Sequence, residues 1–308
     1  MFFYSECESQ ADNAPQHKNR GQRWIPKLGK SKLAASLLGD LSVRITLLIN
    51  RDLASNVALN LLLPQLVERH QLTAFYSDRV GTQPDDPSLA MLFFFEHTLL
   101  DQLLFPPIDD LSQRGKRLTF RALSTFLTAP MQRLNDPNSP SGIALLKSAN
   151  PDLIVSIRYG RILKQSAIDI PRLGALNLHS GKLPQYRGVM ATFRALLAGD
   201  AKLFSTLHWI DDETIDTGRI ISIQGVPTDP DGCYLSNTLN LYPSGCRALL
   251  DAINTLHAQV SLKAVAPNSP GHYFTFPDRD ALARFHRAGH SLVNPALLAP
   301  ILSSYYPH

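Results

Sequence analysis

Short apolar segments alternate with longer helical patterns along most of this chain of 308 residues. The runs Arg44–Asn50 and Leu153–Ile157 are almost entirely apolar and have the length of buried strands, whereas Leu53–His70 repeats leucine and valine at helical spacing. Strands without a polar face need helices on both sides of their sheet, and such sheets are mostly parallel. The sequence therefore predicts an α/β fold, in which ligands bind beyond the carboxyl ends of the strands.

The other expected elements continue this alternation. Further strands are predicted at Leu72–Tyr76, Leu118–Leu123, Leu173–Leu178, Ser205–Ile210 and Ile220–Val226. Helices are predicted at Ser88–Leu104, Ser141–Ser148, Ala191–Ala198, Tyr234–His257 and Asp278–Ala288. Apolar residues surround the Ser88–Leu104 helix on all sides, so we expect it to be largely buried.

Three regions follow from the distribution of apolar and charged residues. Residues 1–42 are polar and basic, and we expect a separable extension there. Residues 43–257 contain the expected domain, and residues 258–308 form an expected tail with one short helix. Most of the net charge of +4 lies in the extension, which leaves the body nearly neutral. A neutral body argues against a nucleic-acid groove.

Several common classes of site and location have no support in the sequence. Cys7, Cys233 and Cys246 form no CxxC pair, so neither a disulfide framework nor a thiolate zinc site is predicted, and a reducing cytoplasm fits best. Prolines interrupt the uncharged stretch Ala288–Pro307, which we interpret as coil and not as a membrane span. The first turn after a strand, Asn50–Asn56, lacks the glycines of a dinucleotide site.

One strand end carries two polar side chains on the same face. Asn177 and His179 are two residues apart, so both point the same way, and an amide and an imidazole can together donate to an oxygen that gains charge in acyl transfer. Asp216 lies in a loop between two predicted strands, close to Gly218. Taken singly, each of these residues also fits an ordinary structural role in a strand end or a solvated loop.

Together the two segments resemble the folate-dependent formyltransferase family. NLHSGKLPQYRG at 177–188 is similar to that family's NxHxSxLPxYRG, and DTGRII at 216–221 to its DxGxII. The resemblance implies a Rossmann-like formyltransferase domain that uses 10-formyltetrahydrofolate and no metal, with Asn177, His179 and Asp216 at the catalytic positions. It also implies folate contacts from Arg161, Ile162, Leu163, Asp211, Asp212 and Ile215.

The chain departs from the family's pattern in three places. Gly181 stands where many members have serine. The interval from His208 to Asp216 is one residue longer than the family's, so we leave His208 out of the catalytic set and interpret it as a strand residue. The turn Asn50–Asn56 lacks the glycines that cradle phosphate in glycinamide ribonucleotide formyltransferase, which disfavours that acceptor.

The expected function is therefore an N-formyltransferase acting on a small amine or hydroxylamine. An amino-sugar nucleotide, an amino acid and a precursor of a specialised metabolite are the candidate acceptors. Residues 258–308 do not supply the large basic domain of methionyl-tRNA formyltransferases, so we expect neither a nucleic-acid partner nor a membrane partner, and we leave a homodimer open. The alternatives are a formyltetrahydrofolate hydrolase, whose regulatory domain residues 1–42 do not match, and a non-catalytic folate-binding protein.

Overall fold

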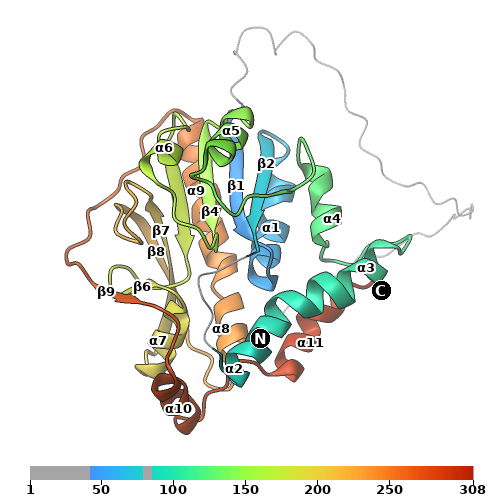
Figure 1. The fold of residues 1–308 in the computed structure, drawn as a ribbon, viewed down its shortest axis with the longest axis vertical. Coiled ribbons are helices and arrows are strands. Elements are labelled where there is room, and N and C mark those ends of the chain that lie inside the picture. The colour runs from blue at the N-terminus through green and yellow to red at the C-terminus, as the bar shows by residue number, and fades with distance from the viewer. Residues whose placement is uncertain (1–41, 79–84, 308) are drawn as a thin grey trace, which may run out of the picture. The chain divides into compact units, whose positions relative to one another are not determined.

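The computed structural model describes residues 42–78 and 85–307, so residues 1–41 of the expected extension lie outside the described residues. The strands of its main sheet are β1 (Arg44–Asn50), β2 (Gln71–Ser77), β3 (Gln132–Arg133), β4 (Leu153–Ile157), β5 (Ala175–His179), β7 (Lys202–Trp209) and β8 (Ile220–Pro227). Their order is β3-β2-β1-β4-β5-β7-β8 (Figure 1). The first five strands in this order pair in parallel. β7 pairs antiparallel with both of its neighbours, β5 and β8. The predicted mostly parallel α/β sheet is confirmed.

Helices cover both faces of this sheet. Ile45, Leu47 and Ile49 of β1 belong to one hydrophobic cluster with α1 (Leu53–Leu66) and α9 (Tyr242–His257). Leu48, which points the other way, packs in a second cluster with α5 (Pro140–Ser148) and α6 (Gln165–Ile168). Because successive side chains of a strand point to opposite faces, an unbroken apolar strand feeds both clusters.

Two predictions of secondary structure, one strand and one long helix, are wrong for reasons of local sequence. Leu118–Leu123 is not a strand, because the Thr119 hydroxyl accepts from the N–H of Ala122 at 3.1 Å and starts the short helix α4 (Phe120–Leu123). The predicted helix Tyr234–His257 is divided into α8 (Tyr234–Leu239) and α9. Pro243 stands in the first turn of α9, where its missing N–H is tolerated, whereas it could not continue α8.

The helix predicted at Ser88–Leu104 exists, but the expectation that it is largely buried is wrong. It is part of a continuous helical stretch formed by α2 (Pro87–Phe93), the π-helix η1 (Phe94–Leu104) and α3 (Phe105–Asp109). Met91 is 53% exposed and Leu103 54% exposed, because only one stripe of this stretch faces the core. Within the described ranges, Pro87–Asp109 alone has the length and mean hydropathy of a membrane span, 23 residues at 1.2. One helix of this kind is weak evidence for a membrane span. Glu96 in this helix forms an ion pair with Arg158, which follows β4 of the main sheet.

Residues 258–308 contain more structure than the one helix predicted there. They form β9 (His272–Phe274), α10 (Arg279–Arg287) and α11 (Pro295–Ser303). Ala288–Pro307 is therefore not coil: Asn294 caps α11, and Pro295 occupies its first turn. β9 pairs with β6 (Tyr186–Gly188), and α11 runs beside α2, η1 and α3 (Figure 1).

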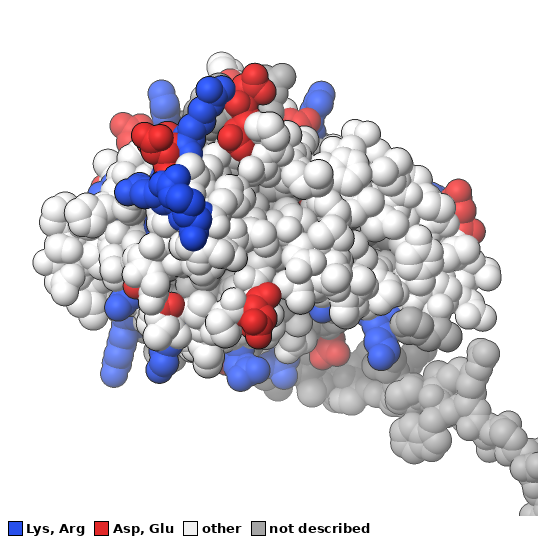
Figure 2. Space-filling view, turned by 90° about the horizontal axis from the view of Figure 1, so that it is seen from below, with Lys and Arg blue, Asp and Glu red and all other residues white. Residues whose placement is uncertain are grey.

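Charged side chains are sparse on the face to which α2, α10 and α11 contribute. Figure 2 shows Lys and Arg mainly near the margins of this face, with Asp and Glu among them, and a largely uncharged centre. This face therefore carries no continuous basic stripe.

The docking of α11 gives a first testable prediction. Tyr305 is fully buried, its hydroxyl donates to Asn56 Oδ1 at 2.6 Å, and its ring lies 5.1 Å from that of Phe105. Replacing Tyr305 by alanine should lower the free energy of unfolding by about 3 kcal/mol, and replacing it by phenylalanine by about 1 kcal/mol. Urea unfolding measures both. The exposed neighbour Tyr306→Ala is the control, and an equal loss in that control would contradict the docking.

Candidate active site

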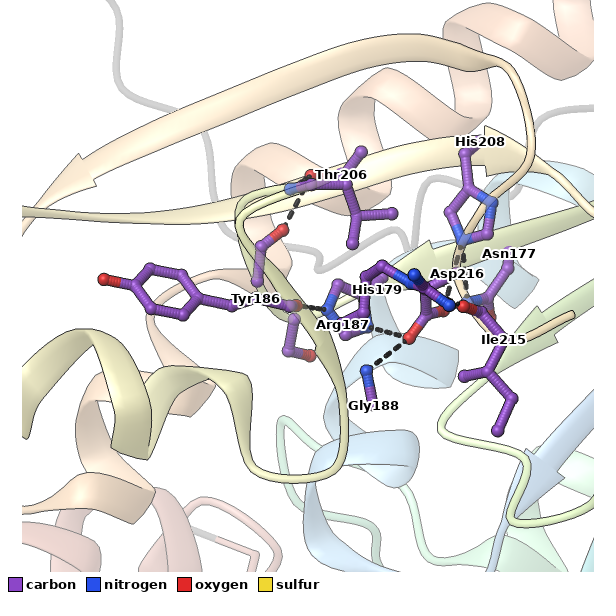
Figure 3. A network of polar contacts seen from close by, with 12 residues as sticks. Asn177, His179, Tyr186, Arg187, Gly188, Thr206, His208, Ile215 and Asp216 are labelled. Carbon is purple, nitrogen blue, oxygen red and sulfur yellow. Dashed lines mark hydrogen bonds and ion pairs between the residues drawn. The ribbon is translucent and has the colours of Figure 1, made fainter. Parts of the chain in front are cut away.

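A cluster of four polar side chains lies at the ends of β5 and β7 (Figure 3). Asn177 and His179 come from β5, His208 from β7, and Asp216 from the loop between β7 and β8. The structure thus brings together the three residues that the sequence motifs singled out. The predicted common direction of Asn177 and His179 follows from the strand's alternation.

The carboxylate of Asp216 is the centre of this cluster. Its Oδ2 accepts from the N–H of Gly188 at 2.8 Å and lies 3.5 Å from Nδ1 of His179. Its Oδ1 lies 3.3 Å from Nδ2 of Asn177 and 3.5 Å from Nε2 of His208. Burial alone would raise the pKa of Asp216, but the two histidines and the Gly188 N–H outweigh it and hold this pKa far below its usual range. Asp216 is therefore a carboxylate at neutral pH.

Backbone carbonyls fix the orientation of both histidines. Nε2 of His179 donates to the carbonyl of Tyr186 at 2.7 Å, and Nδ1 of His208 donates to the carbonyl of Trp209 at 2.7 Å. A carbonyl can only accept, so in each ring the nitrogen facing it carries the hydrogen. The second nitrogen of each ring, Nδ1 of His179 and Nε2 of His208, is thereby left facing Asp216.

The structure places His208 inside the cluster, where the sequence analysis did not include it. The amide nitrogen of Asn177 lies 3.1 Å from Nε2 of His208. The pairing of β7 with β8 shifts register between Leu207 and His208, which absorbs the extra residue before Asp216. Counting residues between the two positions could not reveal this shift.

Gly181, the departure from the family's serine, also has a local cause. A Cβ at this position would lie 2.4 Å from Cβ of Ala191 and 2.6 Å from Nε2 of His179. Neither distance is compatible with a side chain, so glycine is required if His179 is to keep its hydrogen bond to Tyr186.

The cluster opens into a cavity of about 410 Å³. Five of the six residues expected to contact folate line this cavity: Arg161, Ile162, Leu163, Asp212 and Ile215. Asp211 does not line it. Its carboxylate instead accepts from the backbone N–H of Arg219 at 2.9 Å and pairs with that residue's guanidinium at 2.7 Å. We therefore assign Asp211 to holding the loop together.

One wall of this cavity consists of residues that were not predicted from the sequence. Asn50, Glu96, His97 and Arg158 line it from the end of β1, from η1 and from the residue after β4. Asn50 and Arg158 could have been predicted as cavity residues, because both lie at the carboxyl end of a parallel strand, where ligands bind. In the part of the chain that the structure describes, no group of three or more His, Cys, Asp or Glu residues could hold a metal ion.

Parts of the chain are similar to known proteins. Residues 108–237 match the family model described as formyl transferase. The chain is 30% identical over 239 residues to the methionyl-tRNA formyltransferase of Chromohalobacter salexigens, an alignment that covers 75% of this chain and 63% of that protein. The chain is therefore similar to the formyl transferase family over these residues. Its expected resemblance to this family is thereby confirmed.

A second relative matches over a different span. The methionyl-tRNA formyltransferase of Fusobacterium nucleatum is 30% identical over 173 residues, which are 55% of this chain and 54% of that protein. The chain thus spans between half and two thirds of the length of these two curated relatives.

Solved structures of the family share the fold. A sugar N-formyltransferase from Shewanella superposes with a TM-score of 0.51 at 16% identity, covering 77% of this chain and 79% of that one. Glycinamide ribonucleotide transformylase 1 from Symbiobacterium toebii also gives a TM-score of 0.51 at 16% identity, covering 74% and 95%. These likenesses confirm the fold predicted from the motifs.

The lowered pKa of Asp216 predicts how stability depends on pH. A carboxyl whose folded pKa is depressed stabilises the fold above its unfolded pKa, and this stabilisation is lost as the pH falls toward the folded value. The stability difference between the wild type and Asp216→Asn should therefore narrow from pH 5 to pH 3. Urea unfolding at several pH values measures it, with the exposed Asp251→Asn as control. A difference that widens in this range would contradict the ionised state.

Proposed function

We propose that this chain is a folate-dependent N-formyltransferase, which moves a formyl group from 10-formyltetrahydrofolate to the amine of a small molecule. The observation that carries the proposal is the buried cluster of Asn177, His179, His208 and Asp216 at the wall of one cavity. The cavity volume of about 410 Å³ lies within the range of small-molecule sites.

One wall of the cavity fits a reduced pterin. Ile162, Leu163, Ile210 and Ile215 line it with apolar side chains, and Ile162 remains 51% exposed. An exposed isoleucine in a concave wall is suited to the face of a flat ring. When bound, the folate would supply the activated formyl group, and Arg161 and Asp212 would add polar contacts beside this wall.

The reaction needs no nucleophile from the protein, because the acceptor amine itself attacks the formyl carbon. The protein must stabilise the negative charge that develops on the carbonyl oxygen, accept the proton that the amine loses, and return a proton to the folate nitrogen N10 when its bond to the formyl carbon breaks. Asp216 is a weak base, because its pKa is far below the usual range. We therefore assign the proton to a ring nitrogen that faces Asp216, and we assign Asp216 to stabilising the resulting imidazolium.

His208 and Asn177 couple the proton to the oxygen. In the structure the amide of Asn177 donates to Nε2 of His208 and to Asp216, so neither of its hydrogens is directed at a substrate. A proton taken up at Nε2 of His208 would end that nitrogen's role as an acceptor. The hydrogen of Asn177 would then be released for the charged oxygen at the moment when the charge develops.

Two features support a small acceptor. The face shown in Figure 2 lacks the basic stripe that a tRNA would need. Parts of residues 258–308 pack within the domain, because β9 pairs with β6 and Tyr305 is buried. The curated relatives named above are methionyl-tRNA formyltransferases, and one structural neighbour is a sugar N-formyltransferase. For this chain we favour a small amine over a tRNA as the acceptor.

The assay that tests this function offers 10-formyltetrahydrofolate together with a panel of small amines and charged initiator tRNA. Tetrahydrofolate release and a product heavier by one formyl group are expected with a small amine. Turnover with water alone would identify a hydrolase, and saturable folate binding without turnover would identify a binding protein. Efficient formylation of the tRNA would overturn the assignment to a small acceptor.

Substitutions in the cluster should lower kcat much more than folate affinity. Asp216→Asn, His179→Ala and His208→Ala should each reduce kcat about a hundredfold or more, as expected for lost acid–base or charge-stabilising groups. The double variant of His179 and Asp216 should be far less impaired than the product of the single effects, because the two groups act as a unit. Steady-state kinetics and folate Kd measure this, with Asp251→Asn as control. Full activity of Asp216→Asn would contradict the mechanism.

The apolar wall predicts the opposite kinetic pattern. Ile162→Ala removes apolar area that the pterin would cover, so folate KM should rise about tenfold with little change in kcat. Ile223→Ala is a matched control, because Ile223 is 39% exposed on β8 and does not line the cavity. A rise in KM of the same size in both variants would argue against a pterin at Ile162.

A further inference from the structure

The wall formed by Asn50, Glu96, His97 and Arg158 has no part in the proposed chemistry, and we call these residues the distal wall. The reacting cluster lies on β5 and β7, and the expected folate contacts follow β4 and β7. Strand β1, which ends in Asn50, lies on the far side of β4 from β5. The distal wall is therefore the side of the cavity that is left for the acceptor.

Asn50 carries a buried donor without a partner. Its side chain is fully buried, and its Oδ1 accepts from the N–H of Arg51 at 2.9 Å. Because that N–H is a donor, the atom facing it must be the oxygen, so the amide nitrogen points away from Arg51. This nitrogen has no hydrogen-bond partner among the described residues. An unpaired buried donor is costly, and an oxygen of a bound ligand would remove the cost.

Arg158 offers a second donor in a fixed position. Its Nε donates to Asp52 at 2.6 Å and its Nη2 to Glu96 at 2.8 Å. Within the described ranges no hydrogen bond is found for Nη1, and the side chain remains 19% exposed. Two carboxylates thus hold the guanidinium in place and leave one nitrogen for a ligand.

The charges around this wall do not favour a phosphate. Arg158 is paired with two acidic side chains, Asp52 and Glu96, so this wall has no net positive charge from Arg158. The nearby Arg51 is paired with Asp101 at 2.5 Å. The Asp52 carboxylate also occupies the N-terminus of α1, where it accepts from the N–H of Ser55 at 2.7 Å. An anion that needs this helix terminus would meet a carboxylate there.

We propose that the acceptor of this enzyme is an unphosphorylated small amine whose far end carries a hydroxyl or carbonyl oxygen, bound by Nδ2 of Asn50 and Nη1 of Arg158. This inference rests on the proposed function and narrows its substrate class to amino alcohols, amino sugars and amino amides. Glu96 and Asp52 are then specificity residues, because they orient Arg158 and neutralise its charge. Neutral oxygens remain good acceptors for such a guanidinium, whereas a phosphate dianion is repelled by the carboxylates.

Matched pairs of amines test the proposal by equilibrium binding, independently of turnover. Glucosamine, serinol and threonine amide are each compared with their O-phosphates by calorimetry on the full chain. The unphosphorylated member should bind at least tenfold more tightly in the pairs that bind. Tighter or equal binding of the phosphates, or no binding of any unphosphorylated amine, would overturn the proposal.

Two sets of variants locate the effect. Asn50→Ala should weaken binding of the unphosphorylated amine at least fivefold, and Asn50→Asp, which keeps the size of the side chain but loses the donor, should do the same. Glu96→Gln leaves Arg158 with one carboxylate, so the preference against phosphate should shrink at least tenfold. Asp110→Asn removes an exposed carboxylate at the C-terminal end of α3 that does not line the cavity, and it should leave the preference unchanged. Equal changes in these two variants would overturn the role of Glu96.

Formyl transfer is assayed separately on the same amines. Selective binding without transfer to any amine would contradict the proposed function and leave the distal wall as a binding site for neutral amines. Transfer with a preference for the phosphates would support the function and overturn the inference about the distal wall.

Discussion

The buried carboxylate of Asp216 is the constraint on which the rest of the site depends. A carboxylate can be kept ionised in a protein interior only if donors or cations surround it. The Gly188 N–H and the Asn177 amide donate to this carboxylate, the rings of His179 and His208 lie 3.5 Å from it, and these groups come from β5, β6 and β7. Satisfying one charge therefore fixes the relative positions of β5, β6, β7 and the loop before β8.

Features encoded by short-range patterns could be predicted from the sequence. The bounds of β1 and β4 agree with the structure because polar residues directly flank both apolar runs. Asn177 and His179 could be placed together because the alternation of a strand is independent of its surroundings. Asp216 was recognised through its motif, and its loop does bring it to both residues.

Features set by long-range packing could not be predicted in this way. The register shift beside His208 depends on how β8 pairs with β7. The exposure of Met91 and Leu103 depends on which stripe of the helix meets the core, and an all-apolar pattern does not specify a stripe. The helix α11 was not predicted because its prolines argue against a helix, although Pro295 lies in the first turn, where proline is favoured.

The pairing of β9 with β6 sets the smallest unit that could be transplanted into another protein. Gly188, whose N–H holds Asp216, pairs with Phe274, and the guanidinium of Arg187 donates to the carbonyl of Pro270 at 2.7 Å. A fusion or chimera joined directly after His257 would keep Asn177, His179, His208 and Asp216 but remove the strand that supports the contact between Gly188 and Asp216. The smallest unit that keeps this cluster intact therefore extends beyond β9.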